Sequence, residues 1–394
     1  MIKKIKSNKQ VRKIIVFMLF IIGKIMELFI KKKDKKIKTN EIKNIFINAN
    51  FSAIGNFLLF TPLIRNLKEN LPNSHITLMI VKNPNYQFIK NTKYCDTIIE
   101  FPTKFLGLMK LGLSLRKKHF DLGISNYYNG TSRKIPLFFL LMGIPYRITH
   151  IDPLMPTKLF YNKSFSCFFT HKIPLQDKHE IDINLDIIRL LGIKPNRDKF
   201  ILNIPEKDEQ FAEQFFKEHN INEKNLVIGF HAGSNDKQTW KRWSKFKFAK
   251  LANLLKKKYN SINILFGGPN EIELNNEIFD LMGKEGINLA GKITLTQVAA
   301  IIKRCTLLVA NDSGLMHIAS IMKVPSFVII GPTDYIRSGP FFEKSQIIRI
   351  DLPCSRCYRL DSYNPEKCNF GLKCLKLIEP EMVLNKIDEF LSKN

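Results

Sequence analysis

An alternation of short apolar segments, glycine-containing turns and amphipathic segments runs twice through this 394-residue chain. The first run covers residues 44–141 and the second covers residues 226–330. In each run a short apolar strand enters a turn and is followed by a segment with helical spacing. Because strand–helix–strand units pair their strands in parallel and cover a sheet on both faces, the pattern predicts two α/β domains.

The first run begins with a predicted strand that leads through the turn Ala49–Asn56 into a helix. Its predicted elements are, in order, strand 45–48, helix 57–70, strand 76–81, strand 97–100, helix 106–118, strand 121–125 and helix 137–141. Scattered prolines and aromatics predict a loop over residues 150–175. A helix over 179–191 follows, and we expect the crossing to the second domain between Pro195 and Asn225.

Every strand of the second run is followed by a turn rich in Gly, Ser or Asp. The predicted strands are 226–230, 261–266, 306–309 and 326–330, with a short strand and turn over 288–293. The predicted helices are 246–259, a helix after Glu271, 296–303 and 315–322. Ligands of open parallel sheets bind at the carboxyl ends of the strands. We therefore predict several phosphate-binding turns along one edge of this sheet.

The turn Asn311–Gly314 is the clearest of these candidates. It joins the strand over 306–309 to the helix over 315–322. Asp312 or Ser313 can cap the helix, Gly314 allows a ligand close to the backbone, and the first helical N–H groups favour an anion. The alternative is that Asn-Asp-Ser-Gly is ordinary turn chemistry that only joins two elements.

The net charge of +27 is unusually positive for a globular chain. It predicts attraction to a polyanion, whether an anionic bilayer, a phosphorylated glycolipid or a nucleic acid. A lysine-rich compositional habit of the source is the alternative explanation. Because no recognised RNA-binding or DNA-binding module is present, nucleic acid is not an expected partner.

Residues 14–30 are almost wholly apolar and are flanked by lysine runs on both sides. Seventeen residues are at the short limit for spanning a bilayer, and Lys24 and Glu27 lie three positions apart where they can pair. No small-residue cleavage site follows, which argues against a removed signal peptide. An anchor lying in the cytoplasmic leaflet is the preferred interpretation; a spanning helix and a helix packed on the protein are the alternatives.

Four of the seven cysteines, Cys354, Cys357, Cys368 and Cys374, fall in one C-terminal stretch. The odd total and the absence of a cleavable signal predict a reducing compartment. One close pair is compatible with structural zinc, but the second pair is too widely spaced for the usual zinc ribbon. Packed thiols or a redox-labile pair are therefore preferred, and no metal is expected at the functional site.

Five ordered segments resemble the bacterial lipopolysaccharide heptosyltransferases, which are inverting glycosyltransferases of family 9. They are INANFSAIGNFLLFTPLIRNLKENLPNSHITLMI, FHAGSNDKQTWKRWSKFKFAKLANLL, ILFGGPNEIE, NLAGKITLTQVAAII and VANDSGLMHIASIMKVPSFVIIGPTD. The resemblance covers most of the chain from Asn44 onward. It implies a GT-B fold in which two Rossmann-like domains face each other across a cleft.

The resemblance also implies a domain order and a reaction. We expect a membrane-associating segment over 1–40, an acceptor-binding domain over 41–205 and a nucleotide-sugar-binding domain over 206–350. The last segment, 351–394, would carry the cysteines and a C-terminal helix, 380–391, that packs back on the first domain. The implied reaction transfers heptose, or a related sugar, from an ADP-activated donor to a lipid-linked core oligosaccharide at the cytoplasmic face of the inner membrane, without a cofactor or metal.

Individual positions carry roles over from the family. Lys241 would stabilise the leaving nucleotide by its positive charge. The other implied donor-binding positions are Ser234, Glu271, Gly291, Ile293, Asp312, Ser313, Gly314 and His317. Of these, Glu271 would contact the ribose and Ile293 the adenine. The alternatives are that Lys241 is a solvated surface lysine, His317 a satisfied helix histidine and Ile293 plain core.

Ser52, Gly55 and Asn56 lie on the implied acceptor side, where the sequence departs from the family pattern. The family has Gly-Asp at this turn, and that Asp is taken as the general base, but this chain has Gly55-Asn56. An amide has no useful basicity. Either Asn56 orients the acceptor while another group takes the proton, or the acceptor differs, or the protein binds sugar nucleotides or glycolipids without turnover.

Overall fold

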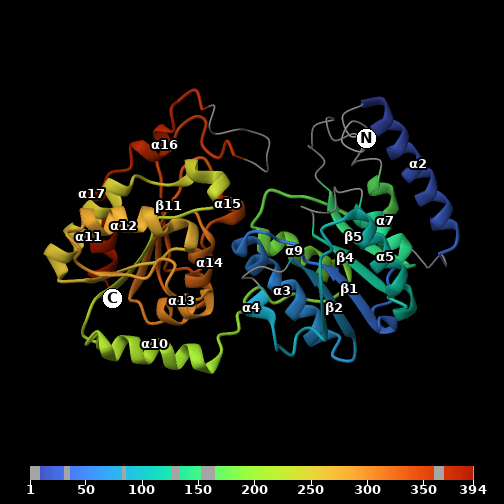
Figure 1. The fold of residues 1–394 in the computed structure, drawn as a ribbon, viewed down its shortest axis with the longest axis horizontal. Helices are drawn as coiled ribbons and strands as arrows, with labels where there is room; N and C mark the ends of the chain where they lie inside the picture. The colour runs from blue at the N-terminus through green and yellow to red at the C-terminus, as the bar shows by residue number, and fades with distance from the viewer. Residues whose placement is uncertain are drawn as a thin grey trace. The chain divides into compact units, whose positions relative to one another are not determined.

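The chain forms two compact α/β units in a computed structural model that describes residues 9–30, 36–81, 86–126, 134–151, 165–358 and 368–393. The first unit comprises Met1–Ser52, Phe60–Asp177 and Ile181–Ile201. The second comprises Ala53–Leu59, Lys178–Glu180 and Leu202–Asn394. Each unit contains one six-stranded sheet in which every neighbouring pair of strands is parallel (Figure 1).

The first sheet has the strand order β3-β2-β1-β4-β5-β6. Its strands are β1 (Asn44–Asn48), β2 (His75–Ile80), β3 (Thr97–Glu100), β4 (Leu122–Ser125), β5 (Tyr146–Ile151) and β6 (His171–Pro174). Its helices are α2 (Lys9–Leu28), α3 (Ile54–Asn70), α4 (Tyr86–Ile89), α5 (Phe105–Leu115), α7 (Lys134–Leu141) and α9 (Glu180–Leu190), with short 3-10 segments η1 (Thr39–Glu41), η2 (Arg116–Lys118) and η4 (Ser166–Phe168).

The central strand β1 is buried on both faces, as its continuous apolar sequence requires. Ile45, Phe46 and Ile47 are all inaccessible to solvent. Phe46 lies edge-on to Phe138 and Phe139 of α7, with ring centroids 5.5 and 5.9 Å away. The core on this face of the sheet is therefore built largely from aromatic rings.

Two strands in the first sheet lie in or beside the predicted loop over residues 150–175. β5 was not predicted, and β6 contradicts the loop prediction, although residues 152–164 lie outside the described part of the chain. β6 is a four-residue edge strand that pairs only with β5 and ends at Pro174. A short edge strand with alternating exposure and a proline gives a weak sequence signal.

The N-terminal helix α2 packs on the first unit, as the alternative interpretation of a helix packed on the protein expects. One side of α2 packs on α7 and η4, where Gly23 lies so close to Phe168 that an added Cβ would come within 2.6 Å of its ring. Glu27 pairs with the buried Arg147 at 3.2 Å. Among the described residues, no helix is both long enough and apolar enough to cross a membrane.

The second sheet repeats the topology of the first, with the order β12-β11-β10-β7-β8-β9. Its strands are β7 (Val227–His231), β8 (Ile262–Leu265), β9 (Ile287–Asn288), β10 (Leu307–Asn311), β11 (Ser326–Ile329) and β12 (Gln346–Ile348). Its helices are α10 (Glu206–Glu218), α11 (Lys245–Tyr259), α12 (Ile272–Leu281), α13 (Leu295–Ile302), α14 (Gly314–Ile321), α15 (Tyr335–Ser338), α16 (Lys373–Lys376) and α17 (Pro380–Leu391), with 3-10 segments η5 (Asp236–Lys241) and η6 (Pro269–Glu271). The short edge strand β12 and the helix α10 were not predicted.

The C-terminal helix α17 has the predicted bounds, Pro380–Leu391. It packs against α11 and β12 of the second unit. Val383 and Ile387 enter the core of the second unit, and Asp388 accepts hydrogen bonds from Lys258 and Tyr259 of α11. The amphipathic pattern predicts the helix and its buried side, but it does not show which element covers that side.

The strand orders bring two particular turns together in each unit. The order reverses direction between β1 and β4 in the first sheet and between β7 and β10 in the second. Helices following the strands on either side of such a point leave the sheet in opposite directions, which opens a crevice at the carboxyl ends of the strands. In the second unit the turns at this point are residues 232–235 and 312–314.

Candidate functional site

Asn311, the last residue of β10, ties the two turns of the second unit together. Its side chain is fully buried. The amide nitrogen donates to the carbonyl of Ala232 at 2.7 Å, and the amide oxygen accepts from the backbone N–H of Trp243 at 3.0 Å. An amide suits this position because it offers a donor and an acceptor at once. Asn311 therefore fixes the turn after β7 and the segment before α11 relative to β10.

Lys241 and Asp312 form an ion pair beside these turns. The Lys241 ammonium lies 2.8 Å from Oδ2 of Asp312, with the two side chains 13% and 8% exposed. It also lies 5.6 Å from the centroid of the Trp240 ring and 5.7 Å from that of Tyr358. Lys241 is therefore not a solvated surface lysine, which was the alternative interpretation of its sequence position.

The ionisation of Asp312 depends on this pair. Burial raises the pKa of the Asp312 carboxyl, but Lys241, Thr333 and His317 outweigh burial and hold the pKa below its usual range. Asp312 is therefore an anion at neutral pH and Lys241 its counter-ion. A bound diphosphate at this edge would meet an ammonium that is already oriented.

His231, at the end of β7, connects Ser313 to Glu271. Its Nδ1 lies 2.8 Å from Oγ of Ser313, and its Nε2 lies 3.3 Å from Oε2 of Glu271. Ser313 occupies the predicted N-cap position of α14, but its hydroxyl makes no capping bond in the structure. The backbone N–H groups at the start of α14 are thus not capped by this side chain.

Glu271 is buried against the turn after β7. It accepts a hydrogen bond from the backbone N–H of Gly268 at 2.8 Å. Burial raises the pKa of the carboxyl, but His231, the Gly268 N–H and Arg242 together lower it below its usual value. A Cβ on Gly233 would lie 1.7 Å from Oε1 of Glu271, so only glycine fits beside this carboxylate. In this arrangement Glu271 supports the turn, and its proposed contact with a ribose stays a prediction.

Ser234 is held from two sides. Its hydroxyl donates to the carbonyl of Gln238 at 3.1 Å and accepts from Nε of Arg242 at 3.1 Å. Nη2 of Arg242 donates to the backbone carbonyl of Ser234 at 3.0 Å. The guanidinium thus places a second positive charge next to the turn that the sequence predicted to bind phosphate.

His317, in the first turns of α14, is buried and stacks on Phe341 with the rings 14° from parallel. A Cβ on Gly55 would lie 2.7 Å from Cδ2 of His317. Burial, together with the nearby His179, lowers the pKa of His317 to about 3. His317 is therefore neutral at pH 7, and its Nδ1 has no hydrogen-bond partner within the described part of the chain.

Acid is expected to destabilise the protein through His317. The unfolded chain takes up a proton here near pH 6.5, whereas the folded protein does not until about pH 3, so stability falls as the pH drops below 6.5. Between pH 6.5 and 5 the free energy of unfolding of the wild type should fall by about 2 kcal/mol more than that of His317→Gln. Urea unfolding across this range measures the difference. His75→Gln, at an exposed histidine, is the control, and parallel curves for wild type and His317→Gln would contradict the assignment.

The remaining predicted donor residues lie farther along the same unit. Gly291 has φ of +70°, and a Cβ there would lie 2.5 Å from Ile272. Ile293 is half-buried in the turn before α13, so it is not plain core. Gly314 is the first residue of α14, and a Cβ on it would lie 2.0 Å from Ile54.

On the acceptor side, Ser52 is exposed in a bend, while Gly55 and Asn56 lie in the first turn of α3. Asn56 is half-buried. The first unit carries a buried polar group at the carboxyl ends of β1 and β4 that the sequence did not indicate. Asn48 donates to the Ser125 hydroxyl at 3.2 Å, and Asn126 donates to the Asn48 carbonyl at 3.2 Å.

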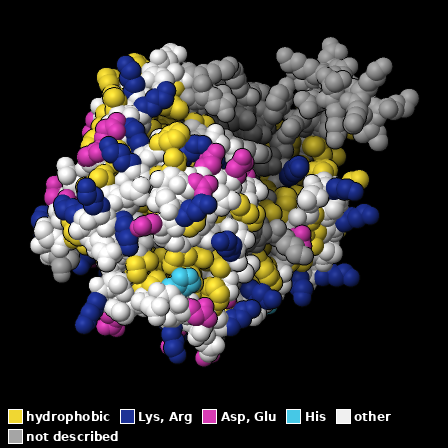
Figure 2. All heavy atoms as spheres, turned by 60° about the vertical axis from the view of Figure 1, so that its left-hand side comes forward, with side chains coloured by type: hydrophobic (Ala, Val, Ile, Leu, Met, Phe, Trp, Pro, Cys, Tyr) yellow, Lys and Arg dark blue, Asp and Glu magenta, His cyan; other side chains and the backbone are white. Residues whose placement is uncertain are grey.

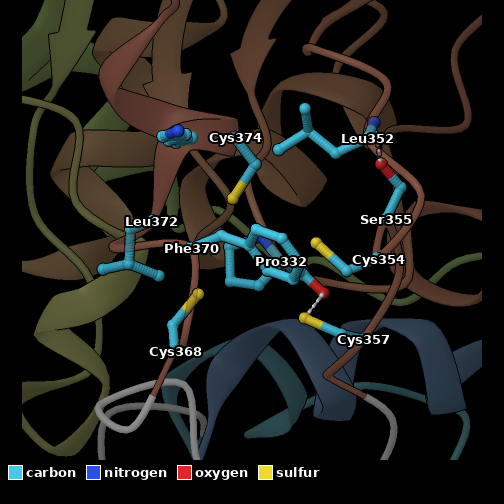
Figure 3. Close-up of a pocket in the computed structure, with 10 residues that line it drawn as sticks. Pro332, Leu352, Cys354, Ser355, Cys357, Cys368, Phe370, Leu372 and Cys374 are labelled. Atoms are coloured by element: carbon cyan, nitrogen blue, oxygen red, sulfur yellow. Dashed lines mark hydrogen bonds between the residues drawn. The ribbon is translucent and has the colours of Figure 1, made fainter.

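The four C-terminal cysteines line one small pocket of about 10 Å³ (Figure 3). Their thiols lie around Pro332, whose carbonyl is 4.0 Å from Sγ of Cys357. Burial raises the pKa of Cys374 to about 11 and also raises that of Cys357. In the part of the chain that the structure describes, no three His, Cys, Asp or Glu side chains are placed to hold a metal ion.

Figure 2 shows Lys and Arg side chains spread over much of the face in view, among apolar and acidic ones. Many of the lysines pair with carboxylates, as Lys245 does with Glu277 and Lys258 with Asp388. Part of the positive charge is therefore balanced by neighbouring carboxylates at the surface.

The structure brings Lys241 and Asp312 together, and links Ser313 to Glu271 through His231. His231, Asn311 and Arg242 were not among the predicted site residues. His231 could have been found, because it ends a strand directly before a glycine turn. Arg242 and Asn311 contact residues that lie eight and 79 positions away in the sequence, and sequence spacing alone does not reveal such contacts.

The sequence pattern of glycosyltransferase family 9 (heptosyltransferase) matches residues 108–367. The chain is 27% identical over 358 residues to lipooligosaccharide heptosyltransferase 2 of Haemophilus influenzae, covering 87% of this chain and 98% of that protein. It is 28% identical over 316 residues to lipopolysaccharide heptosyltransferase 2 of Escherichia coli K12, covering 76% and 86%.

Solved structures agree on the fold. A family 9 glycosyltransferase from Veillonella parvula gives a TM-score of 0.74 at 22% identity, covering 92% of this chain and all of that one. The Escherichia coli ADP-heptose LPS heptosyltransferase II gives 0.66 at 22% identity, covering 89% and 99%. These matches confirm the predicted fold class, an α/β fold of the GT-B type.

Proposed function

Because this chain belongs to glycosyltransferase family 9 (heptosyltransferase), we propose that it transfers a heptose from an ADP-activated donor to the core oligosaccharide of a lipopolysaccharide or lipooligosaccharide. The relatives named above carry this activity in their names, and one solved relative is described as binding ADP. The acceptor is lipid-linked, and the reaction takes place at the cytoplasmic face of the inner membrane.

The observation that carries the proposal is the buried Lys241–Asp312 pair at the topological switch point of the second sheet. A nucleotide diphosphate leaving group develops negative charge as the glycosidic bond to the donor breaks. Lys241 stabilises that charge, and the N–H groups at the start of α14 contribute the positive end of the helix dipole. The mechanism needs no metal ion and inverts the configuration at the anomeric carbon.

Asn56 is the residue that favours a second candidate, a protein that binds sugar nucleotides or glycolipids without turnover. In the proposed enzyme Asn56 orients the acceptor hydroxyl, and another group takes its proton. Asn56 is the third residue of α3, where the helix dipole would keep a carboxylate ionised. Replacement by Asp therefore supplies a base without moving the backbone.

Asn56→Asp is expected to raise kcat by about tenfold to a hundredfold. The gain is smaller than the full effect of a positioned base, because another group already takes the proton in the wild-type enzyme. Asn56→Ala is expected to lower kcat/KM by about tenfold by loss of an oriented hydrogen bond. Mass spectrometry of the acceptor after incubation with ADP-heptose measures both. Asn70→Asp, the same chemical change at the other end of α3, is the matched control.

If the wild type shows no transfer while Asn56→Asp does, the native protein is the binding protein and not the enzyme. If all variants transfer equally, Asn56 does not contact the acceptor. Either result would separate the role of this side chain from the family assignment, which does not depend on it.

A further inference from the structure

The N-terminal helix α2 has two apolar sides, and the described residues of the protein pack against one of them. At about 100° per residue, the exposed residues occupy an arc of about 140° around the helix. We call this set the apolar stripe: Phe17, Met18, Ile21, Ile22, Ile25, Leu28 and, one residue past the helix end, Phe29. Their exposed fractions run from 41% for Ile21 to 79% for Leu28.

The opposite side of α2 is fixed to the first unit. Phe20 lies 5.5 Å from the Phe168 ring centroid, and Gly23 gives the helix room to approach η4 and α7. Leu19, Met26 and Ile30 complete this contact. The stripe is therefore held in a defined orientation rather than on a free tether.

A buried ion pair reinforces the contact. Arg147 is 3% exposed and donates to the carbonyls of Phe168 and Ile144, both at 2.6 Å, and to Glu27 at 3.2 Å. Pulling α2 away would leave Arg147 without its carboxylate partner. A helix with one side engaged in this way cannot be surrounded by lipid.

We propose that the apolar stripe of α2 docks the protein on an anionic lipid bilayer, with the helix axis in the plane of the interface. The proposal deepens the proposed function, because it rests on a lipid-linked acceptor and assigns the surface that meets the lipid. Aliphatic and aromatic side chains on one helical face, beside flanking cations, are the features of helices that bind bilayer interfaces.

The positive charges that flank α2 in the sequence indicate which partner covers the apolar stripe. The sequence supplies Lys3, Lys4, Lys6, Lys9, Arg12 and Lys13 before the stripe, and Lys31, Lys32, Lys33, Lys35, Lys36 and Lys38 after it. Lys24 lies between the two groups and is 47% exposed. Two copies of this chain meeting through the stripe would bring these like charges together, whereas anionic headgroups neutralise them. The observations therefore favour a bilayer over a second copy.

The test compares binding of the full-length protein to vesicles of phosphatidylglycerol and phosphatidylcholine with binding to phosphatidylcholine alone. The variant Phe17→Gln/Ile21→Gln/Ile25→Gln removes three stripe residues but keeps good helix formers and leaves the packed side intact. The control Phe246→Gln/Leu281→Gln/Leu377→Gln changes side chains of the second unit with closely matched exposure, 62%, 41% and 50% against 66%, 41% and 50%.

We expect the wild type and the control to sediment with anionic vesicles, and the stripe variant to bind on the order of a hundredfold more weakly. Binding should weaken with added salt and be poor on phosphatidylcholine alone. Equal binding of the stripe variant, no binding of the wild type, or salt-independent binding to neutral vesicles would each overturn the proposal. The proposal would also be overturned if the wild type formed a dimer without lipid and the stripe variant were a monomer.

These binding measurements contain neither donor nor acceptor, so they do not depend on sugar transfer. Transfer to a core oligosaccharide freed of its lipid is expected to be the same for the wild type and the stripe variant. Absence of transfer in both would overturn the proposed function and leave the docking result standing. If the wild type transfers sugar but does not bind the vesicles, only the proposal of a docking surface is overturned.

Discussion

Lys241→Met is expected to lower kcat for heptose transfer by about a hundredfold to a thousandfold. The substituted side chain keeps the length and apolar stem of lysine but removes the charge beside the turn after β10. The leaving diphosphate then loses the ammonium that lies 2.8 Å from Asp312 in the free protein. Steady-state rates of ADP release measure the effect.

The same substitution also removes the counter-ion of a buried carboxylate. Asp312 would remain 8% exposed without its partner, and such losses cost about 3–5 kcal/mol. Lys241→Met/Asp312→Asn separates the two effects, because it removes the stranded charge. Its stability should recover towards that of the wild type, while transfer stays low.

Lys245→Met is the matched control, since Lys245 is close in sequence but pairs with Glu277 at the surface, with the two side chains 33% and 44% exposed. It should retain both stability and transfer. If Lys241→Met kept the wild-type rate, or if the double variant regained transfer, Lys241 would have only a structural role.

Gly233→Ala is expected to destabilise the second unit by about 1–3 kcal/mol and to weaken ADP binding by at least about tenfold. The new methyl group would lie 1.7 Å from Oε1 of Glu271, so the carboxylate must leave its place between His231 and the Gly268 N–H. The turn after β7 loses its support as a result. Thermal unfolding and ADP titration measure the two consequences.

Gly233→Ala/Glu271→Ala tests the stated cause, because the shortened residue 271 leaves room for the added methyl group. The double variant should be less destabilised than the sum of the two single changes. Gly268→Ala is the control in the adjoining loop, where the nearest atom to an added Cβ is 3.8 Å away and φ is −76°. A Gly233→Ala protein with wild-type stability and affinity would mean that Glu271 does not hold this turn.

Much of the fold was predictable because both sheets are buried on two faces. Strands such as β1 and β10 are continuous apolar runs that end in glycine turns, and their positions were predicted to within about two residues. β6 and β12 lie at sheet edges and are short, so few of their residues need to be apolar. The packing partner of α17 could not be predicted, because an amphipathic pattern specifies a buried side but not its neighbour.

The candidate site was predictable where its residues lie in the turn directly after a strand. Asp312, Ser313 and Gly314 were found because their turn joins β10 to α14, and Lys241 was found through the family resemblance. The His231–Glu271 contact joins residues forty positions apart, and it depends on the adjacency of β7 and β8. The spacing of residues in the sequence does not show which strands are neighbours in the sheet, so this contact could not be predicted before the strand order was known.

The most direct test of the account is the mass of the lipid-linked core oligosaccharide in cells that lack this gene. Deletion should leave a core that is short of one heptose, the wild-type gene should restore it, and a gene carrying Lys241→Met should not. A core of unchanged mass after deletion would contradict the assignment of this protein as a heptosyltransferase of lipopolysaccharide core synthesis.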